Sequence, residues 1–208
     1  EKTPGFDGAM LLDSSLTMYF GNSAADAATL KSLLGNKAVH KLEDGTRFLA
    51  LLGECLSAGD FVRAKHDWFK ITKAMDIYHQ DFDLMLTPST ATLAVPVGSL
   101  EMGAAQRMQT KFANALGPSV ARLFKKSLLA LTKEEARKNL DKTPFTQLAN
   151  LTGQPAMSVP LHWSKEGLPC GVQFVAPFGD ELTLFQLAAQ LEQAQPWADK
   201  MPDLIASP

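Results

Sequence analysis

The sequence predicts an α/β fold in which helices pack on a few strands of one sheet. Three observations support this class. A long amphipathic helix leads directly into a short apolar run at residues 84–86, residues 143–176 have the pattern of a helix, an abrupt stop and two strands, and residues 181–194 form a capped final helix. The 208 residues are enough for one domain with a substantial hydrophobic core.

The N-terminal part of the chain predicts two helices. Asn22 or Ser23 can cap a helix that continues to about Leu34, and Gly35 then ends it. A second helix should occupy residues 45–56. Its apolar side chains are Phe48, Leu51, Leu52 and Cys55.

The clearest helical pattern begins at Ser57, which together with Asp60 approximates a capping box. Apolar residues then recur at spacings of three and four, as on one face of an amphipathic helix. The apolar residues 84–86 that follow predict a buried strand, and residues 87–103, broken by Pro and Gly, predict an irregular loop. The apolar face of the helix consists of Ala64, Trp68, Ile71, Met75, Tyr78 and Phe82.

Residues 104–140 have a helical pattern that Gly117 and Pro118 interrupt. Thr132 and Glu135 have the spacing of a capping box, which predicts that the last helical piece begins there.

In the motif at residues 143–176, each turn residue has its own predicted role. Thr143 can cap a helix whose first position is Pro144, and Gly153 can close that helix in the left-handed conformation before Pro155 prevents its continuation. Two strands follow, and Asp180 can cap the final helix. The expected packing face of that helix is Leu184, Phe185, Ala188 and Leu191.

The composition argues against several classes of partner. Net charge is −2, and no basic cluster exceeds Lys125–Lys126, so we expect neither a nucleic-acid nor an anionic-membrane surface. No apolar run reaches the roughly 20 residues of a membrane helix. Cys55 and Cys170 have no CxxC or zinc-ligand spacing, which favours two free thiols and a cytoplasmic location. The chain begins at Glu1 instead of Met, as an excised piece would, so a signal peptide upstream stays an open question.

No catalytic or metal-binding pattern is complete. None of the four histidines lies in an HxxxH or HExxH spacing, so we expect no metal and no cofactor. Asp76 and His79 can touch on the long helix, but a solvent-facing ion pair explains this spacing equally well. Ser119 lacks the final glycine of a nucleophile elbow and no strand precedes it. Asn150 begins a formal glycosylation sequon, which we interpret as a structural helix residue. The residues alone therefore predict no catalytic group.

Three segments of the chain resemble the amidase signature family. They are Tyr78–Pro88, similar to "fDlllTP" after a long helix, Asn150–Pro160, similar to "NltGxPAxSxP", and Gly167–Gln173, similar to "GLPxGxQ". The resemblance implies that residues 1–208 are the C-terminal portion of one amidase-like domain, with helices on a mixed sheet. Residues 6–86 resemble most the hydrolases of 6-aminohexanoate cyclic dimers.

The resemblance also implies a mechanism and partners. Enzymes of this family hydrolyse amide C–N bonds with a serine nucleophile, a second serine on a cis peptide and a lysine. These groups belong to the N-terminal half of the family fold, and this sequence has no Gly/Ser-rich loop with two serines. We therefore expect the chain alone to be inactive. Its expected partners are the N-terminal half of the same protein, a linear or cyclic small-molecule amide bound by the intact enzyme, and, through an exposed apolar face, a second copy.

The loop after the strand at residues 84–86 is the expected pocket element, with Thr87, Ser89 and Thr90 as candidate substrate-binding residues. A solvent-exposed connection explains these residues equally well. Related amidotransferase subunits carry an Asp where this chain has Thr143, which argues against a tRNA-linked glutamine role. The alternative class is a non-catalytic binding or subunit module that retains half of the fold.

Overall fold

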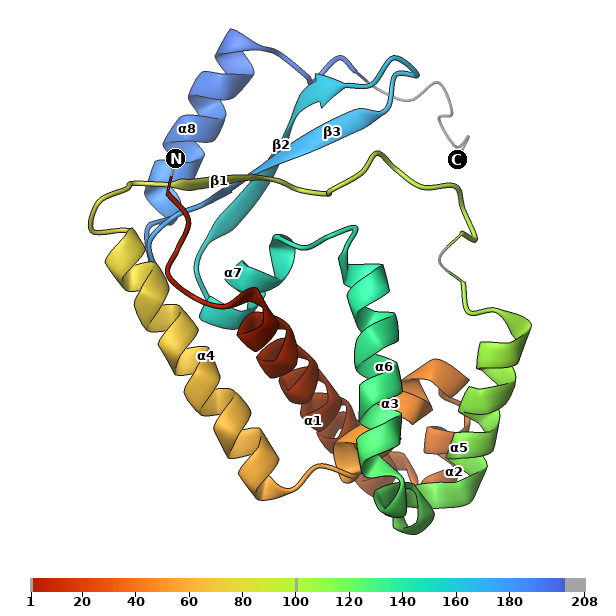
Figure 1. Cartoon of the computed structure of the whole chain (residues 1–208). Coiled ribbons are helices and arrows are strands. Elements are labelled where there is room, and N and C mark those ends of the chain that lie inside the picture. Colours follow the sequence, from red (N-terminus) through yellow and green to blue (C-terminus); the bar gives the residue numbers. More distant parts are fainter. Residues whose placement is uncertain (1, 100, 201–208) are drawn as a thin grey trace. The chain divides into compact units, whose positions relative to one another are not determined.

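The computed structural model describes residues 2–99 and 101–200 (Figure 1). The chain divides into two compact units, and each is built from segments that are discontinuous in sequence. The helical unit contains residues 4–74 and 95–141. The sheet unit contains, among the described residues, 2–3, 75–94 and 142–200. Helices and one sheet together confirm the predicted α/β class.

The helical unit packs its helices around a shared apolar core. Helix α1 packs on α3, and α3 packs on α5. The core side chains are Leu16, Phe20, Leu51, Leu52, Cys55, Ala113 and Ala121. Its helices are α1 (Gly8–Leu34), α2 (Asn36–His40), α3 (Asp44–Glu54), α4 (Ala58–Tyr78, whose last four residues belong to the sheet unit), α5 (Ala104–Leu123) and α6 (Lys125–Leu140).

Helix α1 begins much earlier than the sequence predicted. Its cap is the Asp7 side chain, which accepts a hydrogen bond from the Ala9 N–H, so the prediction of a start at Asn22 or Ser23 is wrong. Gly21 lies inside this helix, where a single glycine is tolerated, and it leaves room for the ring of Phe61, since a Cβ there would lie 2.8 Å from a ring carbon. The predicted end is confirmed, since Gly35 has φ +78°.

Helix α3 confirms the helix predicted for residues 45–56, and it crosses α1 at very short range. Gly53 lies at this crossing and is buried. A Cβ on Gly53 would lie 2.0 Å from the backbone oxygen of Phe20 and 2.7 Å from the Cβ of Ala24. The two helix backbones can approach this closely only because residue 53 has no side chain.

The predicted capping box of α4 is confirmed. The Ser57 N–H donates to Asp60 Oδ2 at 2.8 Å, and the Asp60 N–H donates to Ser57 Oγ at 3.1 Å. The imidazole of His79 donates through Nδ1 to the carbonyl of Phe82 at 3.0 Å, which replaces the expected contact with Asp76. On the predicted apolar face Ala64, Ile71, Met75 and Tyr78 are buried, Trp68 is half-buried, and Phe82 lies beyond the helix end and is exposed.

The Asp60 carboxylate also joins α4 to α6. It accepts a hydrogen bond from Lys125 Nζ at the start of α6, and Arg63 Nη2 lies 2.6 Å from its Oδ1. The hydrogen bond from Lys125, followed by those from Ser57, holds the pKa of Asp60 well below its usual range. Because the folded-state pKa is the lower one, these interactions stabilise the fold above about pH 4 and are lost as the pH falls below it.

We expect Asp60→Asn to lower the free energy of unfolding by about 1–2 kcal/mol at pH 7, through the weaker cap and the lost ion pair. The difference from the parent chain should shrink as the pH falls from 5 toward 2. Urea unfolding followed by circular dichroism at several pH values measures both effects. Asp76→Asn, on an exposed part of the same helix, is the control. A constant difference at all pH values would contradict the assignment to the Asp60 charge.

The predicted interruption of the helical region 104–140 is confirmed, whereas the prediction that Thr132 and Glu135 form a capping box is wrong. Gly117 has φ +71° and kinks α5 ahead of Pro118. Helix α6 already begins at Lys125. Thr132 lies inside it and donates its hydroxyl hydrogen bond to the carbonyl of Leu128 at 2.8 Å. A threonine satisfied by the preceding turn can stay in a helix interior, so the capping pattern started no new helix.

The sheet unit holds three strands and two further helices. Strand β3 is central, in the order β1-β3-β2, and both of its pairings are antiparallel. The strand expected at residues 84–86 is present one residue later, and no parallel pair occurs among the strands that the structure describes. The elements are β1 (Met85–Pro88), α7 (Thr146–Thr152), β2 (Ala156–Trp163), β3 (Pro169–Val175) and α8 (Glu181–Ala194).

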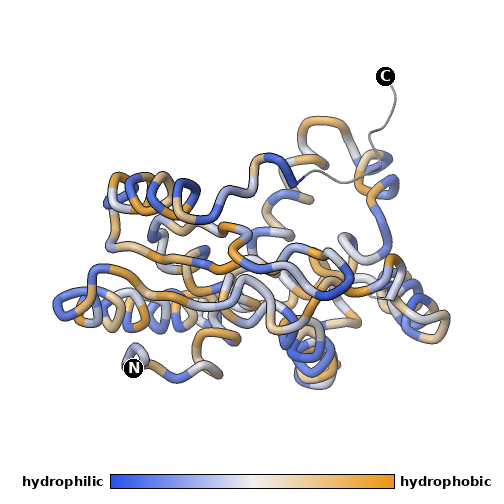
Figure 2. The backbone as a smooth tube through the Cα atoms, turned by 90° about the horizontal axis from the view of Figure 1, so that it is seen from above, coloured by the Kyte–Doolittle hydropathy of each residue, from blue (hydrophilic) through white to orange (hydrophobic). Residues whose placement is uncertain are grey.

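One face of this sheet packs on α8, which Asp180 caps as predicted by accepting from the Thr183 N–H at 3.3 Å. The predicted packing position of Phe185 is wrong, because this side chain is 73% exposed. Several neighbouring positions of α8 are apolar, so the sequence pattern did not decide which side of the helix packs on the sheet. Figure 2 shows how hydrophobic and hydrophilic residues alternate along the helices. The packed side chains are Val159, Phe174, Ala176 and Leu184, with Leu187 and Leu191 at the border.

Helix α7 starts later than expected. Thr143 is not its cap, because α7 begins at Thr146, whose hydroxyl donates to the Thr143 carbonyl at 3.3 Å. Asn150 is structural as predicted, since its side-chain amide donates to the carbonyl of Thr146. The stop at Gly153 is confirmed, with φ +73°. Gln154, buried, donates to the carbonyl of Ala176 at 3.0 Å and so ties the end of the helix to the end of β3.

Candidate functional site

The face of the sheet opposite α8 becomes polar toward one end. Side chains alternate between the two faces of a strand, and directly paired residues share a face. The register places Thr87 of β1 opposite Gln173 of β3, and Gln173 opposite Ser158 of β2. These three polar residues therefore form one row across all three strands. The preceding row on the same face consists of Met85, Val175 and Ala156.

Gln173, the central residue of this row, is buried and connects the row to its surroundings by hydrogen bonds. It is 5% exposed, and its side-chain amide donates to Thr87 Oγ1 at 3.2 Å and to the carbonyl of Phe145 at 3.4 Å. The second bond connects the sheet to the residue that precedes α7. Gln173 therefore fixes the position of Thr87 and of the chain that leads into α7.

A pair of serine hydroxyls lies beside this row. Ser89 Oγ and Ser158 Oγ are 2.5 Å apart, although they come from segments on opposite sides of β3. Alternate strands of a sheet lie roughly 9–10 Å apart, so the two side chains must lean toward each other over the central strand. Gly171 of β3 leaves the space for this, because a Cβ there would lie 2.6 Å from one hydroxyl oxygen and 2.7 Å from the other. We call Ser89 and Ser158 the serine pair.

Two of the three predicted site residues, Thr87 and Ser89, lie at this polar end. The third, Thr90, donates its hydroxyl hydrogen bond to the carbonyl of Thr92 at 2.8 Å within its own loop. Sequence reasoning missed Ser158 and Gly171 as members of the site. Both lie in segments that resemble the amidase family, but the sequence alone did not say that the three segments would share one face of a sheet.

The serine pair can bind but has no means of nucleophilic attack. A serine nucleophile needs an adjacent base. Within residues 2–99 and 101–200, the hydrogen-bond partner of each hydroxyl is the other serine, and no lysine, histidine or carboxylate is bonded to them. The chemistry available is hydrogen bonding to a polar group such as an amide. The part of the chain that the structure describes also holds no group of three or more His, Cys, Asp or Glu residues arranged for a metal ion.

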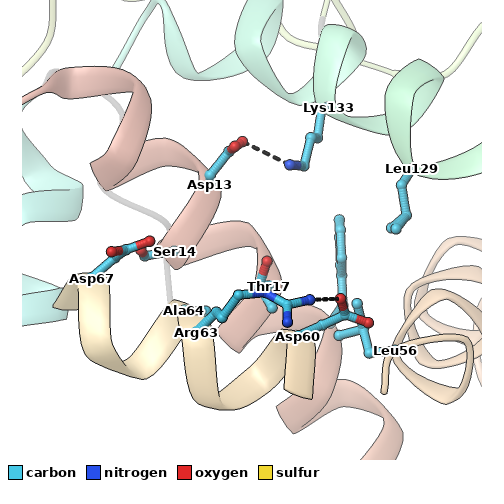
Figure 3. A pocket seen from close by; sticks show the side chains of 11 residues that line it. Asp13, Ser14, Thr17, Leu56, Asp60, Arg63, Ala64, Asp67, Leu129 and Lys133 are labelled. Atoms are coloured by element: carbon cyan, nitrogen blue, oxygen red, sulfur yellow. Dashed lines mark hydrogen bonds and ion pairs between the residues drawn. The ribbon is translucent and has the colours of Figure 1, made fainter. Parts of the chain in front are cut away.

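A hollow of about 240 Å³ lies in the helical unit between α1, α4 and α6 (Figure 3). Its charged side chains all take part in ion pairs. Lys133 lies 2.8 Å from Asp13, and Arg63 lies 2.6 Å from Asp60. These ion pairs account for the charges, and the pair of Lys133 with Asp13 links α6 to α1, so the polar end of the sheet is the better candidate site.

Among the helices that the structure describes, none combines the length and the apolar character required to cross a bilayer.

Comparison with known proteins connects this fold to amide hydrolases. Residues 116–185 match the family model "Amidase". The chain is 31% identical over 209 residues to a lipoamidase of Enterococcus faecalis, covering 95% of this chain and 28% of that protein. It is 48% identical over 67 residues to the 6-aminohexanoate-cyclic-dimer hydrolase of Paenarthrobacter ureafaciens, covering 32% of this chain and 14% of that protein.

A solved structure extends the likeness to the fold. A 6-aminohexanoate cyclic dimer hydrolase complexed with substrate superposes with a TM-score of 0.69 at 22% identity, over 95% of this chain and 37% of that one. The chain thus spans less than two fifths of the length of the relatives it matches. The family match, the sequence relatives and the shared fold agree with the three motif segments, and the chain belongs to the amidase signature family.

Proposed function

We propose that this chain forms part of the substrate pocket of an amide hydrolase whose serine and lysine catalytic groups lie outside residues 1–208, on the N-terminal side. The observation that carries the proposal is the convergence of the three family-like segments. Thr87 comes from the first, Ser158 from the second, and Gly171 and Gln173 from the third, and the register places them together. Polar groups held in fixed positions on a sheet are suited to orienting a substrate.

The substrate class follows from the relatives and the site. The matched proteins are named as a lipoamidase and as hydrolases of a cyclic amide dimer. The polar end of the sheet carries neutral hydroxyl and amide groups, which suit the neutral, hydrogen-bonding amide function. We therefore propose linear or cyclic small-molecule amides as substrates.

We further propose a cytoplasmic location. Cys55 and Cys170 are both free thiols, as expected in a reducing compartment. Burial raises the pKa of the Cys55 thiol, which favours its protonated, unreactive form.

The apolar surface beside α8 supports the proposed partners. Leu182 and Phe185, three apart on α8, and Phe178, just before this helix, are between 66% and 75% exposed. Large apolar side chains grouped on a surface favour contact with another protein segment. We propose that the N-terminal half of the same protein covers them, and that in its absence two copies of the chain associate there.

Two samples test the proposed function. The full natural protein that contains these residues should hydrolyse linear and cyclic amides, whereas the purified 208-residue chain should show no turnover, since loss of the catalytic groups leaves only a small fraction of the rate. Light scattering should show the isolated chain to be larger than a monomer, and Phe185→Ser should lower its mass. Gln186→Ser on the same helix is the matched control.

The opposite results favour the second class of function. Amide turnover by the 208-residue chain alone would contradict the placement of the catalytic groups outside it. A full natural protein that folds and hydrolyses no amide would instead support a non-catalytic binding or subunit module. A self-sufficient, monomeric 208-residue chain would also favour that module.

A further inference from the structure

We propose that the serine pair, Ser89 and Ser158, binds the carbonyl oxygen of the amide substrate through one hydroxyl proton. This inference rests on the proposed function and names the group of the pocket that recognises the amide. The sequence offered Ser89 as one of three candidates, whereas the structure assigns the role to two hydroxyls acting together.

The serine pair has two hydroxyl protons, and only one of them is used in the hydrogen bond between the serines. Each serine hydroxyl carries one proton and can accept two hydrogen bonds. At an O–O distance of 2.5 Å, one hydroxyl donates to the other, and one proton is used. The accepting hydroxyl keeps its own proton, for which the described residues provide no acceptor. The pair therefore presents one unused O–H donor.

This donor should be stronger than that of an isolated serine. A hydroxyl that accepts a hydrogen bond is polarised and becomes a better donor in turn. In an amide, the carbonyl oxygen accepts hydrogen bonds better than the nitrogen does. The corresponding amine has no carbonyl oxygen. The pair should therefore distinguish an amide from an amine.

The surrounding strands hold the pair in place before any ligand binds. The Ser89 N–H donates to the carbonyl of Gly171 at 2.9 Å, which fixes the backbone of Ser89 against β3. Ser158 lies within β2 opposite the buried Gln173. The missing side chain of Gly171 leaves the room in which the hydroxyls meet. Ligand binding then loses little side-chain freedom, which favours affinity.

The pair is also open to a ligand from at least one side. Ser158 is exposed and Ser89 is half-buried in the described part of the chain. A purely structural hydrogen bond between strands would have no reason to favour one ligand over another, and the experiment separates these two roles.

The test uses the full natural protein and two competitive inhibitors of the same carbon skeleton, an amide and the corresponding amine. Ser158→Ala and Ser89→Ala should each raise the KM for the amide substrate about tenfold, with kcat changed less than about threefold. Calorimetry should show the amide inhibitor binding about tenfold more weakly and the amine inhibitor unchanged. Gly171→Ala should have the same effect by forcing the hydroxyls apart.

Controls keep the roles distinguishable. Ser32→Ala removes an exposed hydroxyl of α1 that bonds to the Thr29 carbonyl, and it should change neither inhibitor. The inference would be overturned if the serine variants bound the amide and the amine inhibitor equally more weakly, or if neither affinity changed. In either case, amide hydrolysis by the parent protein would leave the proposed function intact. Since calorimetry requires no turnover, it also tests the pair in a protein that proves to be inactive.

Discussion

Gly53→Ala is expected to lower the free energy of unfolding of the helical unit by about 3 kcal/mol. The added methyl group would lie 2.0 Å from the backbone oxygen of Phe20, and neither atom belongs to a flexible side chain that could turn away. Helices α1 and α3 must therefore separate, which opens the core around Leu16 and Leu52. Urea unfolding of the chain followed by the helical circular dichroism signal measures the loss.

A matched substitution separates this clash from the general effect of replacing glycine in a helix. Gly59→Ala lies in the first turn of α4, where a Cβ would make only ordinary contacts of 3.5 Å or more. Alanine favours helices over glycine by up to about 1 kcal/mol, so this variant should be as stable as the parent or slightly more so. If Gly53→Ala proved as stable as Gly59→Ala, the close crossing of α1 and α3 would be wrong.

Phe174→Ala is expected to destabilise the sheet unit by about 3–5 kcal/mol. Phe174 is 7% exposed on β3 and belongs to the cluster that joins the sheet to α8, together with Val159 and Leu184. Removing its ring leaves a cavity in the apolar cluster between the sheet and α8. Trp163 and Trp197 both lie in this unit, so the midpoint of urea unfolding read from tryptophan fluorescence should fall strongly.

The control for this variant is Leu86→Ala. Leu86 is paired with Phe174 in the register but is 64% exposed, so its loss should cost less than about 1 kcal/mol. Equal destabilisation by the two variants would show that burial against α8 is not what makes Phe174 important.

The sequence predicted well those elements whose signals are local. Gly35, Gly117 and Gly153 were recognised as turn points, and each has a positive φ. The capping box of α4 was recognised because its two residues bond within one turn. Errors arose where a residue typical of a helix end lies inside a helix, as Thr132 does in α6. Gly21 also lies inside a helix, where it leaves room for the ring of Phe61.

The candidate site shows the same division. Ser89 could be named as a candidate because it follows a recognisable strand. Ser158 and Gly171 were missed as site residues, since their importance depends on which strands are neighbours. Antiparallel pairing of β1 with β3 across the sheet cannot be read from alternation within either strand. Only the register of the paired strands shows which residues of different segments lie side by side.

The discontinuous composition of the sheet unit has a consequence for how the protein acquires its structure. Thr87 and Gln173 meet although 86 positions separate them, and one of the two segments of the helical unit, residues 95–141, is encoded between them. The hairpin of β2 and β3 can close locally, whereas β1 must wait for a long loop to close, which is slow. During synthesis β1 is made first and stays without its partner longest. Folding of the helical segment in between, residues 95–141, would shorten that search.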